Sequence, residues 1–295
     1  HPIRRAFASA GVTVALVSVL LLVPDAVTVY ATNMIGALRA PGEPAFIAAH
    51  RGDSARAPEN TMPAFARAFR SDVEFVEADV QLTVDGHAVI IHDETVDRTT
   101  DGTGAVDELT LDQIRALDAG SWHGPDFAGT PVPTLEEFLD GLASSDKKTL
   151  LELKGHWLAA DIERVTIDVY ARGVQDRVVF ASFNLTTIAY LAEAAPAFPR
   201  VIVKRDLPSD PVSLPQYYGA IAILTTPNSL QNDPGVVDRM HEAGLGVLVY
   251  TLNSTQRWEE AHEFGVDGII TDKPTKLVGW ISETVVAPGA TPVTG

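Results

Sequence analysis

The most restrictive feature of this sequence is a regular alternation of short apolar runs with segments of helical periodicity, from residue 45 to residue 282. The segments between runs are long enough for helical crossovers, so neighbouring runs can pair as parallel strands. Runs without polar residues are typical of a sheet that helices cover on its outer face. Eight such units in about 240 residues predict a (β/α)8 TIM barrel. We expect its strands at Ala45–Ala49, Glu74–Gln81, Thr149–Leu153, Val178–Ser182, Val201–Lys204, Ala220–Leu224, Gly246–Leu252 and Gly268–Thr271.

The alternative α/β architecture is a doubly wound open sheet. A dinucleotide-binding sheet of that kind carries a glycine fingerprint between a strand and the helix that follows it. Here the stretch Gly102-Thr103-Gly104 does not link a strand to a helix in that way. The sequence therefore favours the barrel.

Two of the expected helices have local start signals. Asn60 can cap a helix that runs to about residue 71. Thr134 precedes a second helix, and Glu137 follows it at the spacing of a capping box. These signals predict where the helices after the first and second barrel strands begin.

The alternation is interrupted once, by residues 98–133, which are rich in Gly, Asp and Thr. They follow a short strand expected at His87–His92, so we predict a small insertion after the second barrel strand, on the face where loops build barrel sites. The expected organisation is a hydrophobic membrane or signal segment with a linker over residues 1–43, the barrel over 44–285, and a disordered tail over 286–295.

An apolar segment precedes the barrel. Residues 6–23 contain no charged side chain, and as a helix they would be about 27 Å long, close to the thickness of a bilayer core. Arg4 and Arg5 precede them, which by the positive-inside rule keeps the N-terminus in the cytoplasm. A single-span anchor, a cleaved signal peptide and the last span of a longer membrane domain all fit. Each predicts membrane contact through this segment and an extracytoplasmic barrel, either anchored or secreted.

Composition excludes several functions. The formal net charge of −17 makes nucleic-acid binding unfavourable, because the chain would repel a phosphate polymer. A small anion can still bind where a cation reverses the local field. The absence of cysteine excludes thiol chemistry and Cys-ligated zinc. No feature of the sequence predicts the oligomeric state.

Polar side chains follow most of the expected strands, where a parallel barrel brings strand ends to one mouth. Glu77 and Asp79 are two residues apart, so they share one face of their strand, and Glu152 and Lys154 do the same on the next barrel strand. The periodicity therefore predicts that one set of polar residues converges at the mouth: His50, Arg51, Glu77, Asp79, His92, Glu152, Lys154, Lys204, Tyr250, Asn253 and Asp272.

This set indicates metal-assisted hydrolysis of a phosphoester. Glu77, Asp79 and Glu152 would repel one another without a cation, and oxygen ligands suit Mg²⁺ or Ca²⁺. Arg51 and Lys154 add positive charge for a phosphoryl group. Two histidines that titrate near neutrality, His50 and His92, can serve as general base and general acid.

Other residues have structural interpretations of similar weight. Asn60 is either a helix cap or part of the site. Lys204 and Tyr250 either line the mouth or contact substrate. The histidines outside the cluster are interpreted as structural: His123, His156, His241 and His262.

These motifs resemble the glycerophosphodiester phosphodiesterase family over residues 45–283. The resemblance implies a barrel of the phosphatidylinositol phosphodiesterase type, with His50 and His92 as the acid/base pair. It also implies that Glu77, Asp79 and Glu152 bind the metal. Tyr250 stands where many members have Trp. The resemblance is carried by His50-Arg51-Gly52, Pro58-Glu59-Asn60-Thr61, Glu77-Ala78-Asp79-Val80, His92-Asp93, Arg98-Thr99-Thr100, Glu152-Leu153-Lys154, Tyr250-Thr251-Leu252-Asn253 and residues 265–274.

The hypothesis is that a glycerophosphodiester is cleaved to sn-glycerol 3-phosphate and an alcohol, either by water or by the glycerol 2-hydroxyl. One histidine would deprotonate the nucleophile and the other would protonate the leaving alkoxide. Two alternatives stay open. One is phospholipase D-type cleavage of lysophospholipids or sphingomyelin on the same barrel, and the other is a binding module without turnover.

Overall fold

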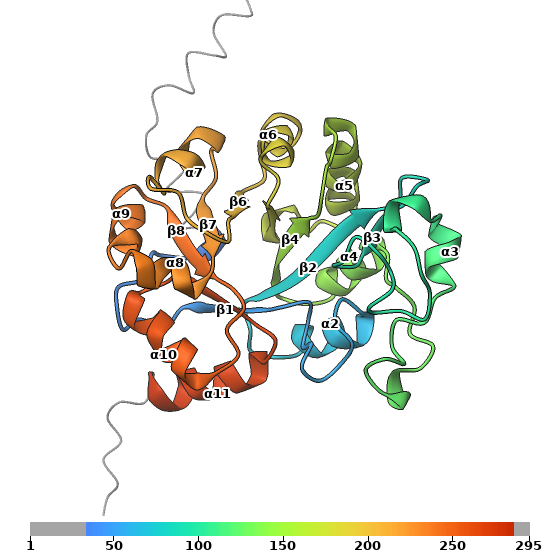
Figure 1. Ribbon diagram of the computed structural model, residues 1–295, viewed down its shortest axis with the longest axis horizontal. Coiled ribbons are helices and arrows are strands. Elements are labelled where there is room, and N and C mark those ends of the chain that lie inside the picture. Colours follow the sequence, from blue (N-terminus) through green and yellow to red (C-terminus); the bar gives the residue numbers. More distant parts are fainter. Residues whose placement is uncertain (1–33, 286–295) are drawn as a thin grey trace, which may run out of the picture.

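The computed structural model describes residues 34–285, and its centre is a closed ring of eight parallel strands surrounded by helices (Figure 1). The strands follow one another around the ring in chain order, and pairing of the first with both the second and the last closes it. The predicted TIM barrel is confirmed. Its strands are β1 (Phe46–Ala49), β2 (Phe75–Leu82), β4 (Lys148–Leu153), β5 (Val178–Ser182), β6 (Arg200–Val203), β7 (Ala222–Thr225), β8 (Gly246–Val249) and β9 (Gly268–Thr271).

The ninth strand is not part of the ring. β3 (Ala88–Ile90) turns back after β2 and pairs with it antiparallel, with Val80 opposite Ile90. Successive side chains of a barrel strand point alternately to the inside of the ring and to the helices outside it. On β2, for example, Phe75 packs inside the ring, whereas Val76, Ala78 and Val80 pack outward against the helices.

The helices form the outer layer, and most lie between two consecutive barrel strands. Their apolar faces close the main core against the outer side of the ring. They are α2 (Met62–Phe69), α3 (Leu111–Arg115), α4 (Leu135–Ala143), α5 (Ala159–Ala171), α6 (Leu185–Ala194), α7 (Ser213–Tyr218), α8 (Pro227–Asn232), α9 (Val236–Glu242), α10 (Thr255–Phe264) and α11 (Pro274–Thr284).

One of the two predicted helix starts is confirmed and the other is wrong. The Thr134 hydroxyl oxygen accepts from the Glu137 backbone N–H, and the Glu137 carboxylate accepts from the Thr134 backbone N–H, which is a full capping box at α4. At α2 the N-cap position belongs to Thr61 instead of Asn60. Asn60 has a φ of 55°, outside the extended conformation that a cap residue adopts, so its side chain is directed elsewhere.

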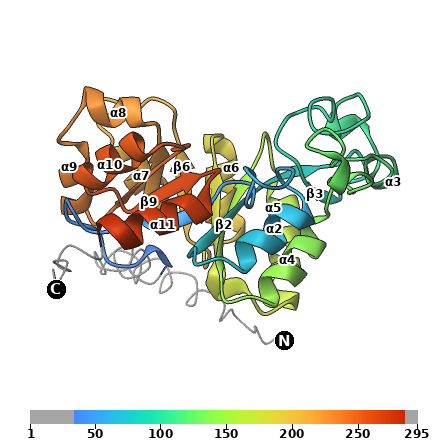
Figure 2. The same cartoon turned by 90° about the horizontal axis from the view of Figure 1, so that it is seen from below.

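The segment that interrupts the alternation has a small core of its own. It contains α3 and two short 3₁₀ turns, and it lies to one side of the barrel beyond β3 (Figure 2). Val106, Ile114 and Val132 from this segment are buried together with Val89 and Ile91 from the β3 region. The insertion is therefore packed onto the hairpin that also carries His92.

The apolar residues 6–23 and the tail over 286–295 lie outside the described residues. Within residues 34–285, no helix is both long and apolar enough to cross a membrane.

Gly52, directly after Arg51, gives a test of how tightly β1 is joined to α2. Its φ is 82°, and an added Cβ would lie 2.6 Å from the Ala64 carbonyl carbon. We expect Gly52→Ala to destabilise the protein by more than the roughly 1–2 kcal/mol that left-handed backbone alone costs a side chain. Urea unfolding measures the difference.

Gly173→Ala is the matched control, because Gly173 has a φ of 65° and no described atom within 4 Å of the added Cβ. Equal losses of unfolding free energy in the two variants would show that the close approach of α2 is not important.

Candidate active site

Three carboxylates meet at the mouth of the barrel. Glu77 and Asp79 lie on the inward face of β2, and Asp79 is paired in register with Glu152 on β4. Oxygen atoms from the three side chains all lie within 4.8 Å of one another. Glu77 and Asp79 are buried and Glu152 is nearly so. The structure thus brings together the carboxylates that strand periodicity placed on the same side.

The carboxylates cannot easily all be ionised together. Burial, reinforced by the charge of Asp79, raises the pKa of Glu77 well above its ordinary value. The same two causes raise the pKa of Glu152 to about 7. Burial also opposes ionisation of Asp79, but the charges of Arg51 and Lys154 outweigh it and lower its pKa. Two of the three acids therefore hold protons more tightly than free carboxylic acids do.

The carboxylates fit a hard divalent cation. They offer only oxygen ligands, and their negative charges would be stabilised by such an ion. Glu152 Oε1 is buried, and among the described residues its close polar partner is the Lys154 ammonium at 2.9 Å. A buried carboxylate oxygen in an acidic cluster is a suitable ligand for a hard cation. We describe Glu77, Asp79 and Glu152 as a possible metal site.

Two basic side chains approach Asp79. Arg51 Nε lies 3.2 Å from Asp79 Oδ2, and Lys154 Nζ lies 3.8 Å from Asp79 Oδ1. The backbone N–H of Arg51 also donates to Glu77 Oε2 at 2.8 Å. Arg51 has a φ of 54°, an unusual conformation for a residue with a long side chain. Glu77 therefore helps to hold Arg51 in a strained backbone conformation beside the acids.

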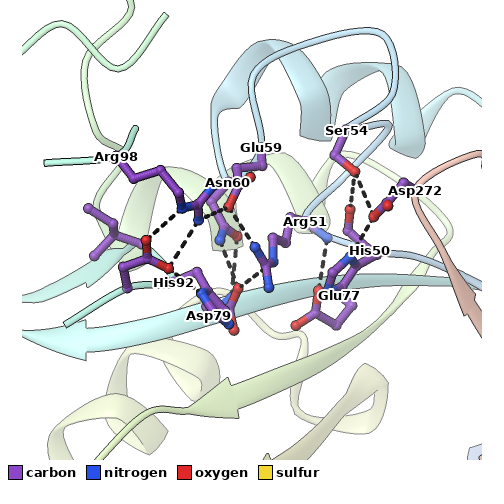
Figure 3. A network of polar contacts seen from close by, with 12 residues as sticks. His50, Arg51, Ser54, Glu59, Asn60, Glu77, Asp79, His92, Arg98 and Asp272 are labelled. Atoms are coloured by element: carbon purple, nitrogen blue, oxygen red, sulfur yellow. Dashed lines mark hydrogen bonds and ion pairs between the residues drawn. The ribbon is translucent and has the colours of Figure 1, made fainter. Parts of the chain in front are cut away.

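His50 is fixed from the far end of the chain. Its Nδ1 lies 2.6 Å from Asp272 Oδ1 (Figure 3). Asn253 donates to the other oxygen of that carboxylate. β1 and β9 are paired in register at Ala49 and Thr271, so the two residues that follow these positions are neighbours. With Nδ1 held by a carboxylate, Nε2 is the nitrogen available for proton transfer.

His92 has the same arrangement with a local partner. Its Nδ1 lies 2.6 Å from Asp93 Oδ1, and Arg98 donates to both oxygens of Asp93. Burial lowers the pKa of His92, against the opposing charge of Asp79. His92 is therefore mainly neutral at pH 7, and Nε2 is again the available nitrogen.

The remaining predicted residues lie around this centre in different ways. The Asn60 amide donates to Asp79 Oδ2 at 2.8 Å and accepts from the Asp79 backbone N–H, so Asn60 holds a carboxylate of the site. The Tyr250 ring meets the Phe183 ring edge-on, and its hydroxyl is buried without a hydrogen bond in the described part of the chain. Lys204 follows β6 and lines a groove beside the mouth.

Four residues hold the site together through contacts that the sequence did not predict, although Asp272 was among the residues expected at the mouth. Asp93 and Asp272 orient the histidines, and Glu59 and Arg98 connect Arg51 to Asp93. A signal for Asp272 was present, because closure of a barrel places the last strand beside the first. Nothing in the spacing of Glu59 and Arg98 predicts that these side chains meet.

Comparison with known proteins identifies the class to which this fold and site belong. The family model described as "Glycerophosphoryl diester phosphodiesterase family" matches residues 50–276. A glycerophosphodiester phosphodiesterase from Caldanaerobacter subterraneus subsp. tengcongensis is 36% identical over 237 residues, which are 80% of this chain and 97% of that protein. The chain therefore belongs to this family of phosphoric diester hydrolases, which confirms the resemblance and the predicted class of enzyme.

Two solved structures of phosphodiesterases have a similar fold. A phosphodiesterase from Oleispira antarctica, in complex with the product sn-glycerol-3-phosphate, has a TM-score of 0.73 and 28% identity and covers 81% of this chain and 97% of that one. A glycerophosphodiester phosphodiesterase from Agrobacterium tumefaciens has a TM-score of 0.71 and 32% identity and covers 80% of this chain and 100% of its own.

The raised pKa of Glu152 makes metal affinity depend on pH. A carboxylate must lose its proton to bind the cation, so binding should release a proton below pH 7. We expect the affinity for Mg²⁺ or Ca²⁺ to rise by at least about tenfold per pH unit below 7, because Glu152, and also Glu77 with its raised pKa, must lose a proton to bind the ion. Calorimetric titrations between pH 5.5 and 8.5 measure this dependence.

Glu152→Gln should bind the metal more weakly, with a smaller pH dependence. An affinity that does not change between pH 5.5 and 8.5 would contradict this assignment of Glu152.

Proposed function

We propose that this protein hydrolyses glycerophosphodiesters to sn-glycerol 3-phosphate and an alcohol, with a divalent metal and two histidines as acid and base. The observation that carries the proposal is the placement of His50 and His92. Both are anchored through Nδ1 to carboxylates, and both follow strands that pair with β2, the strand that carries Glu77 and Asp79. That arrangement leaves two Nε2 atoms for the two proton transfers that phosphodiester hydrolysis requires.

Glu77, Asp79 and Glu152 would hold Mg²⁺ or Ca²⁺, since either ion prefers oxygen ligands. When bound, the cation supplies positive charge that stabilises the phosphoryl oxygens and the charge that develops on them. Arg51 and Lys154 already lie within ion-pair distance of Asp79, so they can contact the same phosphoryl group from the protein side.

The two histidines divide the proton transfers. His92 is mainly neutral at pH 7 because burial lowers its pKa, which favours it as the base that deprotonates the nucleophile. His50 is then the acid that protonates the leaving alkoxide. Water and the glycerol 2-hydroxyl are both compatible nucleophiles, the latter through a cyclic phosphate that is opened in a second step.

We expect metal-loaded protein to release sn-glycerol 3-phosphate from glycerophosphocholine, and a chelator to stop the release. His50→Ala and His92→Ala should each lower kcat by about 10²–10⁴-fold, because each removes a proton-transfer group. His262→Ala is the matched control, since His262 contacts the Glu43 carbonyl away from the acidic cluster. Near-normal turnover by His50→Ala or His92→Ala would rule out the two-histidine scheme.

A second candidate is phospholipase D-type cleavage of lysophospholipids, and a groove favours it. A cavity of about 590 Å³ is lined by the polar residues Lys204, Asp206, Asp210 and Ser213, and the rest of its wall is apolar or aromatic. Leu185 in the groove wall is two residues from Phe183, whose ring contacts Tyr250 and lies 5.5 Å from the Lys154 ammonium, so the groove adjoins this side of the acidic cluster. The apolar walls are formed by Leu185, Leu207, Pro208, Leu214, Tyr217 and Tyr218.

The occupant we propose for this groove is the single acyl chain of a lysophospholipid. We also propose that residues 6–23 keep the barrel outside the cytoplasm and next to a membrane, where such lipids are found. Both proposals favour lysophospholipids as substrates. Assays with glycerophosphocholine cannot test this preference, because that molecule has no acyl chain.

Tyr217, which is 83% exposed, tests the groove with little risk to folding. We expect Tyr217→Ser to raise KM for lysophosphatidylcholine several-fold and to leave KM for glycerophosphocholine unchanged, because only the lipid contacts the groove. Tyr170→Ser is the control. Like Tyr217, which meets the Tyr218 ring edge-on, Tyr170 is exposed and makes an edge-on contact, with Phe198, but it lies on α5 and does not line the groove. If lysophosphatidylcholine is not cleaved, the second candidate function is wrong and only glycerophosphodiester hydrolysis remains.

A further inference from the structure

Arg98, the first residue of the insertion, lies between two carboxylates. Its guanidinium donates to Asp93 Oδ2 through Nε and to Asp93 Oδ1 through Nη2, at 2.6 and 3.0 Å. It donates to Glu59 Oε2 through Nη1 and to Glu59 Oε1 through Nη2, at 2.9 and 2.8 Å. All four bonds are charge-assisted, and each carboxylate is held in the bidentate geometry that arginine favours.

Each of these carboxylates also contacts a residue with a proposed chemical role. Asp93 Oδ1 lies 2.6 Å from His92 Nδ1, and Glu59 Oε1 accepts from Arg51 Nη1 at 2.6 Å. Five side chains therefore form one unbroken chain of contacts, in the order His92, Asp93, Arg98, Glu59 and Arg51. Figure 3 shows its labelled members His92, Arg98, Glu59 and Arg51. The proposed base and the proposed phosphate ligand are connected through the insertion.

The charges in this chain are arranged to keep both carboxylates ionised. The hydrogen bonds from Arg98 are the main cause of the lowered pKa of Asp93. Burial acts against ionisation of Glu59, but Arg98 and Arg51 together lower its pKa below the ordinary value. Without Arg98, Glu59 Oε2 would lose the one hydrogen bond that the described residues supply to it.

The exposure of Arg98 indicates that its role is not mainly stability. Its side chain is 47% exposed, and ion pairs at such positions contribute little to the free energy of unfolding. Glu59 and Arg51 are only 14% and 15% exposed, so their geometry depends on their partners. Arg98 therefore acts mainly on the positions of the carboxylates that it contacts, Asp93 and Glu59, and less on the stability of the fold.

We propose that Arg98 is a positioning residue, which holds His92 and Arg51 in their working positions through Asp93 and Glu59. This role rests on the proposed function, since it assumes that His92 and Arg51 act on the phosphodiester. The insertion would then contribute to the site through its first residue, which lies at the end of the polar network away from Asp272 (Figure 3).

The test is steady-state kinetics of Arg98→Ala and Arg98→Lys with glycerophosphocholine and saturating metal, together with thermal unfolding. We expect both variants to lose roughly 10- to 100-fold in kcat/KM, as is typical when a residue that orients reacting groups is removed. Lysine should not rescue, because an ammonium cannot make two bidentate contacts. The unfolding temperature should stay near that of the parent protein.

Arg115→Ala is the matched control. Arg115 belongs to the same insertion and makes a bidentate ion pair, with Glu137 at 2.7 and 2.8 Å, but it contacts none of the five residues in the chain. It should retain activity close to the parent value. An equal loss in Arg98→Ala and Arg115→Ala, in step with lower unfolding temperatures, would mean that the insertion acts only as a structural support and would overturn the proposal.

Two further measurements separate positioning from stability. In a Glu59→Gln background, Arg98→Ala should cost much less activity than in the parent, because the two residues act in one chain. Guanidinium ion should restore part of the activity of Arg98→Ala, whereas sodium ion at the same ionic strength should not. Additive losses without rescue would overturn the role of Arg98.

The outcome is distinguishable from failure of the proposed function. If His92→Ala is inactive while Arg98→Ala is normal, only the positioning role is wrong. If His92→Ala is as active as the parent, the two-histidine scheme is wrong and the positioning role fails with it.

Discussion

The rest of the site depends on the burial of three carboxylates inside the mouth of a barrel. Placing such groups within 4.8 Å of one another in a buried position is costly unless positive charge and hydrogen bonds compensate. The protein compensates Asp79 with Arg51, Lys154 and the Asn60 amide. Arg51 and Asn60 both have a positive φ, and from this backbone conformation both side chains contact Asp79 on β2. The raised pKa values of Glu77 and Glu152 show that compensation within the protein is incomplete, which is the property expected of a cation site.

Closure of the ring gives His50 a carboxylate partner that lies near the other end of the chain. His50 and Asp272 are 222 residues apart, yet pairing of β1 with β9 makes them neighbours. His92, by contrast, obtains its carboxylate from the next residue. Two histidines with the same Nδ1 environment are thus produced by one long-range contact and one local contact. This similarity supports the proposed role of both histidines in proton transfer, because each has Nδ1 held by a carboxylate.

The mouth has two chemically different sides. On one side, the insertion contributes Arg98, and the contacts from His92 to Arg51 are entirely polar. On the other side, Phe183 lies below the Lys154 ammonium and against Tyr250, and an apolar groove follows. A phosphodiester has the same division, since its phosphoryl group is charged and its substituents can be apolar. The charged side suits the reaction, and the groove is the part of the surface where substrate preference can vary.

The sequence by itself determined the barrel, the inward position of Glu77, Asp79 and Glu152, and the family. These follow from periodicity within single strands and from short motifs, which are local properties of the chain. Only the tertiary structure decided the partners: Asp272 for His50, Arg98 for Glu59, and Asp79 for Asn60, for which the sequence allowed either a helix cap or a place in the site. Such contacts depend on ring closure and on the left-handed backbone at two loop residues, which no local pattern specifies. The hydrophobic segment before the barrel stays a prediction of the sequence alone.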